Sequence, residues 1–142
     1  MPSISLTQLQ QLRQQVLALS SADGTTAVTA ALSSVYGTLQ DAGFSYAGWG
    51  KGVVEQNTAA GISAMQFLTG TALAGLGSIT CQLLTQPQID KLKIDLADAY
   101  LRKLEVIADG SPTVDRDIDA KEVWDIHKEG YQESGLPIAS WT

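Results

Sequence analysis

Hydrophobic residues near the start of the chain recur at steps of three and four, the spacing of one face of a helix. This first set consists of Leu6, Leu9, Leu12, Val16 and Leu19. Ser5 stands just before the set and Gln8 follows three residues later, which is the spacing of a capping box. We therefore expect a helix that begins near Leu6. Its opposite face carries Gln8, Gln11, Gln14 and Gln15.

The same spacing predicts two further helices. One has an apolar face formed by Ala27, Val28, Ala31, Leu32, Val35 and Leu39 and stops at Gly43. A longer helix, from about Gln86 to Ala108, has an apolar stripe formed by Ile89, Leu92, Leu96, Tyr100, Leu104 and Ile107, which Ile94, Ala97 and Leu101 widen. Asp109–Gly110 ends it. The pairs Asp90–Lys93 and Asp98–Arg102 lie at helical contact spacings, and each would add about 0.2–0.5 kcal/mol.

Glycines interrupt the stretch between the second and the long helix. Gly48, Gly50 and Gly52 occupy alternate positions between Phe44 and Val54. Because glycine destabilises a helix interior, we expect a loop or a short, bent connector here. The Gly-Lys-Gly sequence within it lacks the spacing of a phosphate-binding P-loop, so nucleotide binding is not expected.

The stretch from Asn57 to Gln88 is free of charge and mixes bulky apolar residues with many alanines and glycines. Small residues let helix backbones approach closely, in soluble cores as well as in membranes. Three interpretations stay open: a buried core helix or hairpin, an interface with another subunit or partner, and a membrane-inserting hairpin. Gln66, Gln82 and several hydroxyl residues argue against a bilayer crossing.

The fold class that these patterns predict is all-α, because no strand pattern and no internal repeat are found. A last helix is expected after the aspartates at 115–119, ending at Gly130, and an extended tail from Gly135 to Thr142. We expect one domain over 1–142, a compact bundle of about five to six helices with a Gly-rich connector and an extended C-terminal tail. The 142 residues could also be a piece of a longer chain.

Charge divides the chain into two unlike parts. Only five charged residues occur in the charge-poor part, 1–89: Arg13, Asp23, Asp41, Lys51 and Glu55. The acidic part, 90–142, holds seven basic and twelve acidic side chains, a net of −5. Since charged side chains normally keep a surface soluble and unassociated, the charge-poor part is expected to be covered by the acidic part, another subunit, a partner or lipid.

Composition excludes several classes of function. A net charge of −6 without a cluster of basic residues argues against binding nucleic acid through its phosphates. Cys81 is the only cysteine, which excludes an internal disulfide framework and a cysteine-based metal cluster. The glutamine-rich start lacks the pattern of a cleavable signal peptide. We expect a protein that is cytoplasmic, or exported without such a signal, and that uses no cofactor.

Three aspartates form the most suggestive local pattern for a metal site. Asp115, Asp117 and Asp119 alternate as they do at the start of an EF-hand loop, where several oxygens converge on calcium. The pattern departs from that motif downstream, because Ala120 stands where glycine is needed and Ile126 stands where the bidentate glutamate is needed. The alternative is an acidic helix start with solvated carboxylates.

Candidates for catalysis and for partner binding are few. His127 is the only histidine, and Glu122 lies near it at a helical spacing, so the two could form a hydrolytic site with a serine. No nucleophile-elbow motif supports this hypothesis. Trp141, in the predicted tail, and Trp49, in the glycine-rich connector, are the candidate anchors for a partner.

Three functional hypotheses follow. The first is a non-enzymatic helical interaction or assembly protein, using its charge-poor helices for self-association or for docking a protein partner. The second is a small enzyme with acid–base residues within 109–133. The third is a membrane-inserting effector or toxin segment with a central hairpin at 57–88. The composition resembles that of bacterial secreted proteins and phage structural proteins, but no motif identifies a family.

Overall fold

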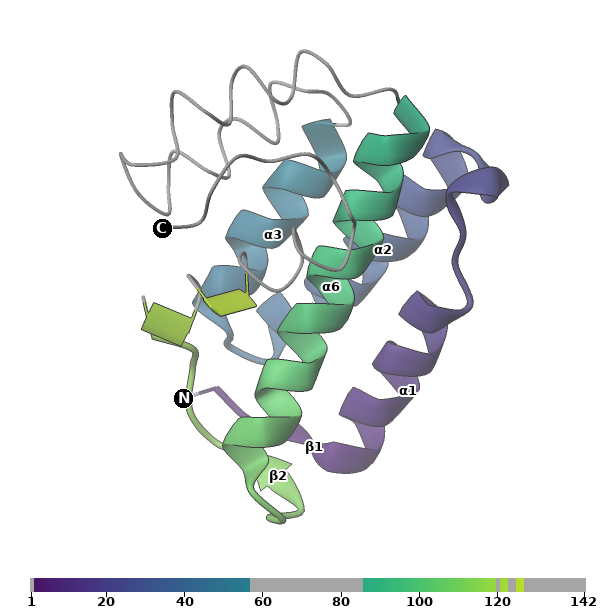
Figure 1. The fold of residues 1–142 in the computed structure, drawn as a ribbon. Coiled ribbons are helices and arrows are strands. Elements are labelled where there is room, and N and C mark those ends of the chain that lie inside the picture. Colours follow the sequence, from purple (N-terminus) through teal and green to yellow (C-terminus); the bar gives the residue numbers. More distant parts are fainter. Residues whose placement is uncertain (1, 57–85, 120, 123–124, 127–142) are drawn as a thin grey trace.

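The computed structural model describes residues 2–56, 86–119, 121–122 and 125–126 (Figure 1). This part of the chain is mostly helical, as the sequence predicted. Its α-helices are α1 (Leu6–Leu17), α2 (Thr25–Asp41), α3 (Ser45–Gln56) and α6 (Gln86–Ala108), and a short 3-10 helix, η1, spans Ser21–Asp23. Residues 121–122 and 125–126 are also helical. The expected total of five to six helices includes elements within 57–85, which lie outside the described residues.

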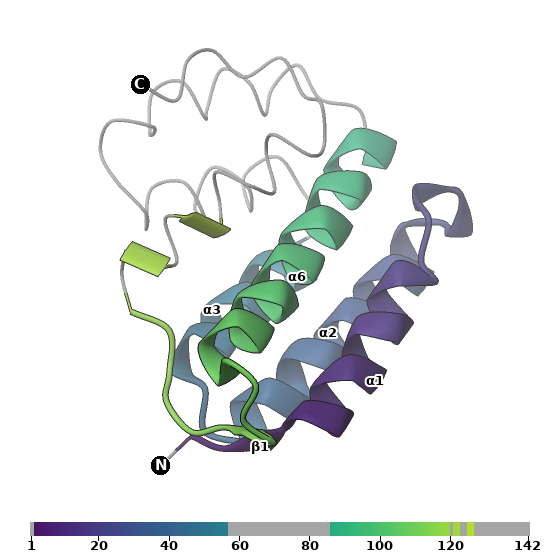
Figure 2. The ribbon, with the colours of Figure 1, turned by 60° about the horizontal axis from the view of Figure 1, so that its bottom comes forward.

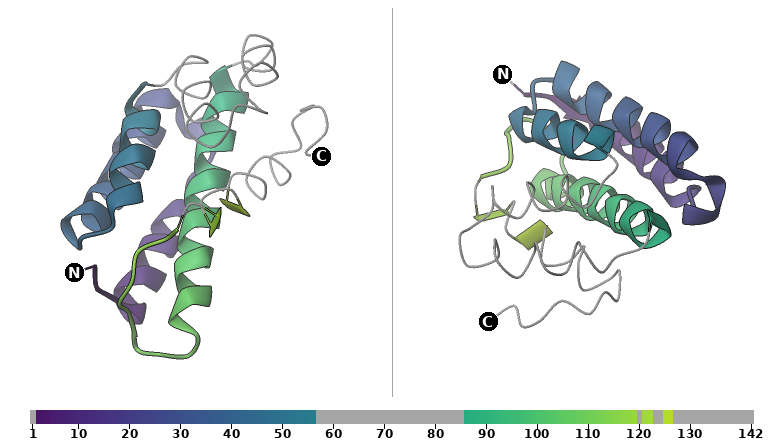
Figure 3. Two further views of the ribbon diagram at one scale, coloured as in Figure 1. Left: turned by 90° about the vertical axis from the view of Figure 1, so that its left-hand side faces the viewer. Right: turned by 90° about the horizontal axis from the view of Figure 1, so that it is seen from above.

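The long helix α6 lies against both α1 and α2, and α2 in turn lies beside α3 (Figure 3). The apolar stripe that the sequence predicted for α6 is buried. Tyr100 of α6 meets Tyr36 of α2 edge to face, with ring centroids 5.8 Å apart. Such a pair adds about 0.5–1.5 kcal/mol beyond the area that the rings bury.

The ends of the predicted helices are confirmed by their local geometry. The Ser5 side chain accepts a hydrogen bond from the backbone N–H of Gln8 at 3.1 Å and so caps α1. Gly43, just after α2, has φ of 99°. Asp109 and Gly110, just after α6, have φ of 49° and 81°. These left-handed conformations end a helix, and glycine adopts them without strain.

The glycine-rich connector is the clearest error of the sequence prediction, because this stretch forms the helix α3. The reason is its packing against α2. A Cβ atom at Gly48 would lie 2.9 Å from Gln40 Nε2, so the glycine leaves room for the Gln40 side chain where the two helices meet. Phe44, Ala47 and Val54 become buried in the process. Tertiary packing therefore outweighs the low helix propensity of glycine.

A short β-ribbon, which the sequence did not predict, joins the N-terminus to the segment after α6. Strand β1 (Ile4–Ser5) pairs antiparallel with β2 (Thr113–Val114), with Ile4 opposite Val114. The backbone N–H of Leu6 donates to the carbonyl of Pro112 at 2.8 Å, next to this pairing. The ribbon fixes the beginning of α1 against the end of α6.

None of the helices in the described ranges combines the length and the apolar character that a membrane crossing requires. The central stretch at 57–85 and the tail from residue 127 onward lie outside these ranges. The three interpretations of the central stretch therefore stay predictions.

Candidate functional site

The three aspartates singled out by the sequence lie in the segment that returns past the start of α3 (Figure 2). Asp115 accepts hydrogen bonds from the Ser3 hydroxyl at 3.1 Å and from the Thr113 hydroxyl at 2.8 Å. It thereby connects the residue before β1 with β2. Its carboxylate serves the same junction as the β-ribbon.

Asp117 lies at the N-terminus of α3. Its carboxylate accepts a hydrogen bond from the backbone N–H of Ser45 at 2.8 Å and a short one from the Ser45 hydroxyl. The first N–H groups of a helix have no partner inside the helix, and the helix dipole favours a negative charge there. An aspartate 72 residues away in sequence thus supplies the cap of α3.

Asp119 and Glu122 form a reciprocal capping box at the start of the helical turn that follows Asp119. The N–H of Glu122 donates to the Asp119 carboxylate at 2.8 Å, and the N–H of Asp119 donates to the Glu122 carboxylate at 3.0 Å. Arg116 also donates to both Glu122 oxygens, at 2.8 and 2.9 Å. These hydrogen bonds from Arg116 lower the pKa of Glu122 to about 2.

The arrangement uses the three aspartates as separate structural links. Asp115, Asp117 and Asp119 bind a strand junction, a distant helix and a nearby turn, respectively. Among the described residues, no group of three or more acidic, histidine or cysteine side chains is placed to hold a metal ion. The calcium hypothesis receives no support from this geometry and stays a prediction, which calorimetric titration with calcium tests.

The remaining candidates are only partly described. Glu122, the proposed acid–base partner, is engaged by Arg116, and its lowered pKa keeps it ionised in the neutral range. His127 and Trp141 lie outside the described residues. Trp49 belongs to α3, and its side chain lies outside the part that the structure describes.

A buried polar cluster, which the sequence did not predict, lies where α6 begins. Asp90 and Lys93 are both buried, with 2% and 1% of their surface exposed. Asp90 accepts hydrogen bonds from the Thr25 hydroxyl at 2.8 Å and from the Gln86 amide at 3.2 Å. Thr25 is the first residue of α2, a helix whose own N-cap, Gly24, provides no side-chain hydrogen bond. Asp90 thus places a negative charge at the positive end of α2.

Lys93 binds the C-terminal end of α3. Its ammonium group donates to the carbonyl of Val54, in the last turn of α3, at 3.2 Å. Cations are favoured at a helix C-terminus, where carbonyl groups lack partners within the helix. Burial lowers the pKa of Lys93 to about 8, and the nearby Asp90 carboxylate opposes that shift. The sequence does contain a signal for this burial, because Lys93 is four residues from both Ile89 and Ala97 on the apolar face.

Arg13, the only charged residue of α1, is bound to α6. Its guanidinium contacts Asp98 at 3.0 Å and Glu105 at 3.4 Å. Asp98 also pairs with Arg102 at 3.1 Å, which confirms the helical pair predicted from the sequence. Two basic and two acidic groups therefore balance one another at the seam between α1 and α6.

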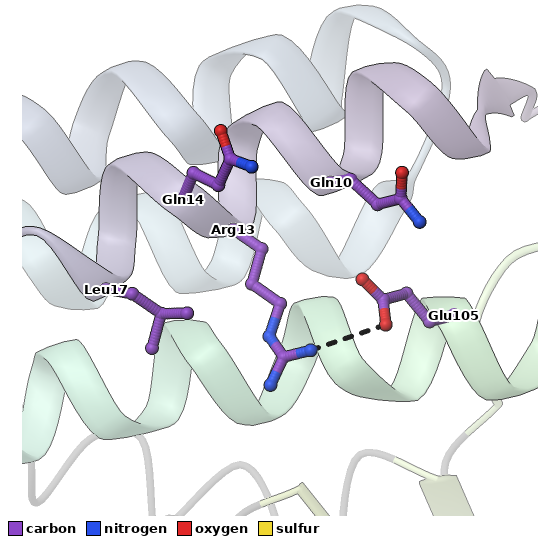
Figure 4. A pocket seen from close by; sticks show the side chains of 5 residues that line it. All are labelled: Gln10, Arg13, Gln14, Leu17 and Glu105. Atoms are coloured by element: carbon purple, nitrogen blue, oxygen red, sulfur yellow. Dashed lines mark hydrogen bonds and ion pairs between the residues drawn. The ribbon is translucent and has the colours of Figure 1, made fainter.

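A groove of about 260 Å³ lies over this seam (Figure 4). Its walls are formed by Gln10, Arg13, Gln14 and Leu17 of α1 and by Glu105 of α6. The Arg13–Glu105 ion pair spans it from one helix to the other (Figure 4). Leu17, at one end, is 60% exposed, although leucine is usually buried.

Most side-chain hydrogen bonds and ion pairs between the two parts of the chain have their carboxylate acceptor in the acidic part. Among the described residues, carboxylates of the acidic part accept from groups in the charge-poor part at Asp90, Asp98, Glu105, Asp115 and Asp117. In the other direction, Lys93 of the acidic part donates to a backbone carbonyl of α3. Helix α1 thus receives acidic partners for Arg13, and α2 and α3 receive charged groups at their ends.

The outward surfaces of α1 and α2 remain nearly free of charge. The exposed residues of α1 are Thr7, Gln8, Gln10, Gln11, Gln14, Gln15 and Leu17. Those of α2 are Thr26, Ala27, Ala30, Ser34, Gln40 and, at its last position, Asp41. This surface consists mainly of amides, hydroxyls and alanines.

Comparison of the chain with models of known protein families, with curated proteins and with solved structures found no match.

Proposed function

We propose that this protein is a non-enzymatic helical assembly protein that binds further copies of itself through the charge-poor outer surface of α1 and α2. The observation that carries this proposal is the absence of charge from the exposed residues of α1, combined with the engagement of Arg13 by Asp98 and Glu105.

The net charge of the chain favours contact between two copies at this uncharged surface rather than elsewhere. At −6, two copies repel each other, and exposed charges interact over a Debye length of about 10 Å at 0.1 M salt. Repulsion is weakest where neither copy presents charge. Glutamine amides both donate and accept hydrogen bonds, so a glutamine-rich surface is complementary to a copy of itself. Charge and hydrogen-bonding capacity therefore both favour a second copy as the partner.

The size of the surface indicates a weak, concentration-dependent association. α1 has 12 residues and is therefore about 18 Å long. A stable interface usually buries about 800 Å² on each partner, which is more than one short helix provides. We therefore expect the association to be weak and to strengthen with protein concentration.

Light scattering across a hundredfold range of protein concentration tests the proposal. A mass that rises with concentration, or a stable oligomer, supports it. A monomer at every concentration contradicts it, and would direct attention to a different partner protein or to the alternative functions of the acidic part.

A further inference from the structure

Three groove-lining residues of α1 form one stripe. Gln10, Gln14 and Leu17 are separated by four and three residues, so they follow one another along the same face of the helix. All three are exposed, with Leu17 at one end and Gln10 at the other (Figure 4). The stripe thus joins an exposed apolar side chain to two amides.

The charges next to this stripe are compensated within the molecule. Arg13 lies between Asp98 and Glu105, and Asp98 also holds Arg102. The seam beneath the stripe therefore presents no net charge to an approaching copy.

We propose that α1 pairs antiparallel with α1 of a second copy, about a two-fold axis that passes beside Gln14. This inference depends on the proposed self-association and specifies its interface. With Gln14 opposite Gln14, Leu17 of each copy lies opposite Gln11 of the other, beside the Gln10 end of the partner's groove. Each exposed leucine is then covered by the other copy.

Three physical features favour this arrangement. A two-fold interface uses the same patch twice and needs a self-complementary surface, which paired glutamine amides provide. Antiparallel helices also place opposite ends of their dipoles together. Finally, covering Leu17, which is 60% exposed, removes apolar surface from water in both copies at once.

Charge substitutions at Gln14 test the axis directly. Gln14→Glu alone and Gln14→Lys alone each place two like charges at the axis, and we expect each to weaken self-association at least about tenfold. An equimolar mixture of the two variants places opposite charges there and should associate at least as strongly as the unaltered protein. The readout is sedimentation velocity as a function of concentration.

The matched control is Gln88, an exposed glutamine at the start of α6. Gln88→Glu and Gln88→Lys should leave the dissociation constant within about twofold, since Gln88 belongs to α6 and lies outside the proposed α1–α1 contact. Thermal unfolding of all four variants checks that each is folded.

The outcomes separate this inference from the proposed function. An unaltered protein that stays monomeric overturns both. An oligomer that Gln14→Glu and Gln14→Lys leave intact retains the proposed function and overturns the two-fold axis at α1. Variants that dissociate but do not recover on mixing also overturn the axis, because the surface then binds something other than the same position of a second copy.

Discussion

The charge-poor helices at 2–56 and the described residues of the acidic part, referred to as the charged segment, contribute differently to the structure. Neither α2 nor α3 has acidic residues in its first turn or basic residues in its last turn. The charged segment supplies these groups instead, with Asp90 at the start of α2, Asp117 at the start of α3 and Lys93 at the end of α3. A helix can therefore have a charge-free surface when a distant segment satisfies its ends.

This division of roles explains the charge asymmetry of the sequence in physical terms. Charges in the second part are directed onto the first, where they cap helices and hold Arg13. The outer surface of α1 is left with amides, one hydroxyl and one exposed leucine. Substitutions in the charged segment should therefore affect stability, while those on the outside of α1 should affect association.

The largest effect is expected at the buried cluster. Asp90→Ala removes the acceptor of the Thr25 hydroxyl and the negative charge nearest to buried Lys93. Leaving one partner of a buried charge pair uncompensated costs about 3 kcal/mol or more of the free energy of unfolding. Asp95→Ala is the control, because Asp95 pairs with half-exposed Lys91 on the same helix and such surface pairs contribute at most about 1 kcal/mol. Urea unfolding followed by circular dichroism measures both, and equal losses would contradict the role given to Asp90.

The pKa of Lys93 predicts an alkaline rise in stability. Burial lowers this pKa to about 8, against 10.5 in the unfolded chain, so above pH 8 the unfolded state binds more protons than the folded state. The free energy of unfolding should therefore increase from about pH 8 to pH 10. Above pH 10 the trend should weaken, because burial raises the pKa of Tyr36 and Tyr100 and so favours the unfolded chain there.

Lys93→Met is the variant that tests this assignment. It removes the titrating amine and keeps a long apolar side chain in the same place. Unfolding measured in urea across this pH range should show the rise in the unaltered protein and a flat profile in the variant. A rise of the same size in both would assign the effect to another group.

A smaller effect is expected at the cap of α3. Asp117→Ala removes the carboxylate that binds the Ser45 N–H and hydroxyl, and the loss of a helix N-cap costs about 1 kcal/mol. Asp117→Asn keeps an acceptor and loses the charge, so it should cost less than the alanine variant. Thermal unfolding ranks the two, and an alanine variant as stable as the unaltered protein would remove Asp117 from the role of cap.

The helices α1, α2 and α6 could be predicted because each has a long apolar repeat and a clear end signal. Ser5, Gly43 and Asp109–Gly110 act locally, and local geometry confirms them. Helix α3 could not be predicted from propensity, because its packing against α2 and the burial of Ala47 and Val54 belong to the tertiary structure. The β-ribbon was missed for a similar reason, since two residues such as Ile4 and Ser5 are too short to show an alternating pattern.

The candidate site shows the same limit. The capping box of Asp119 and Glu122 has a recognisable spacing. The alternating aspartates at 115–119 predict a calcium loop or a solvated helix start, and not three separate structural links. The partner of Asp117 is 72 residues away, so nothing near it in the sequence indicates a cap for α3. The spacing of Asp90 and Lys93 predicts a pair along one helix, but it does not predict that both residues are buried.

The salt dependence of self-association tests the central claim most directly. The claim is that charges are engaged within the molecule and that copies meet through an uncharged surface. Sedimentation velocity at about 0.1 M and about 1 M salt should then show association that is equally strong or stronger at high salt, because screening removes the repulsion between copies of charge −6. Dissociation to monomers at high salt would show that ion pairs join the copies, and would contradict the account.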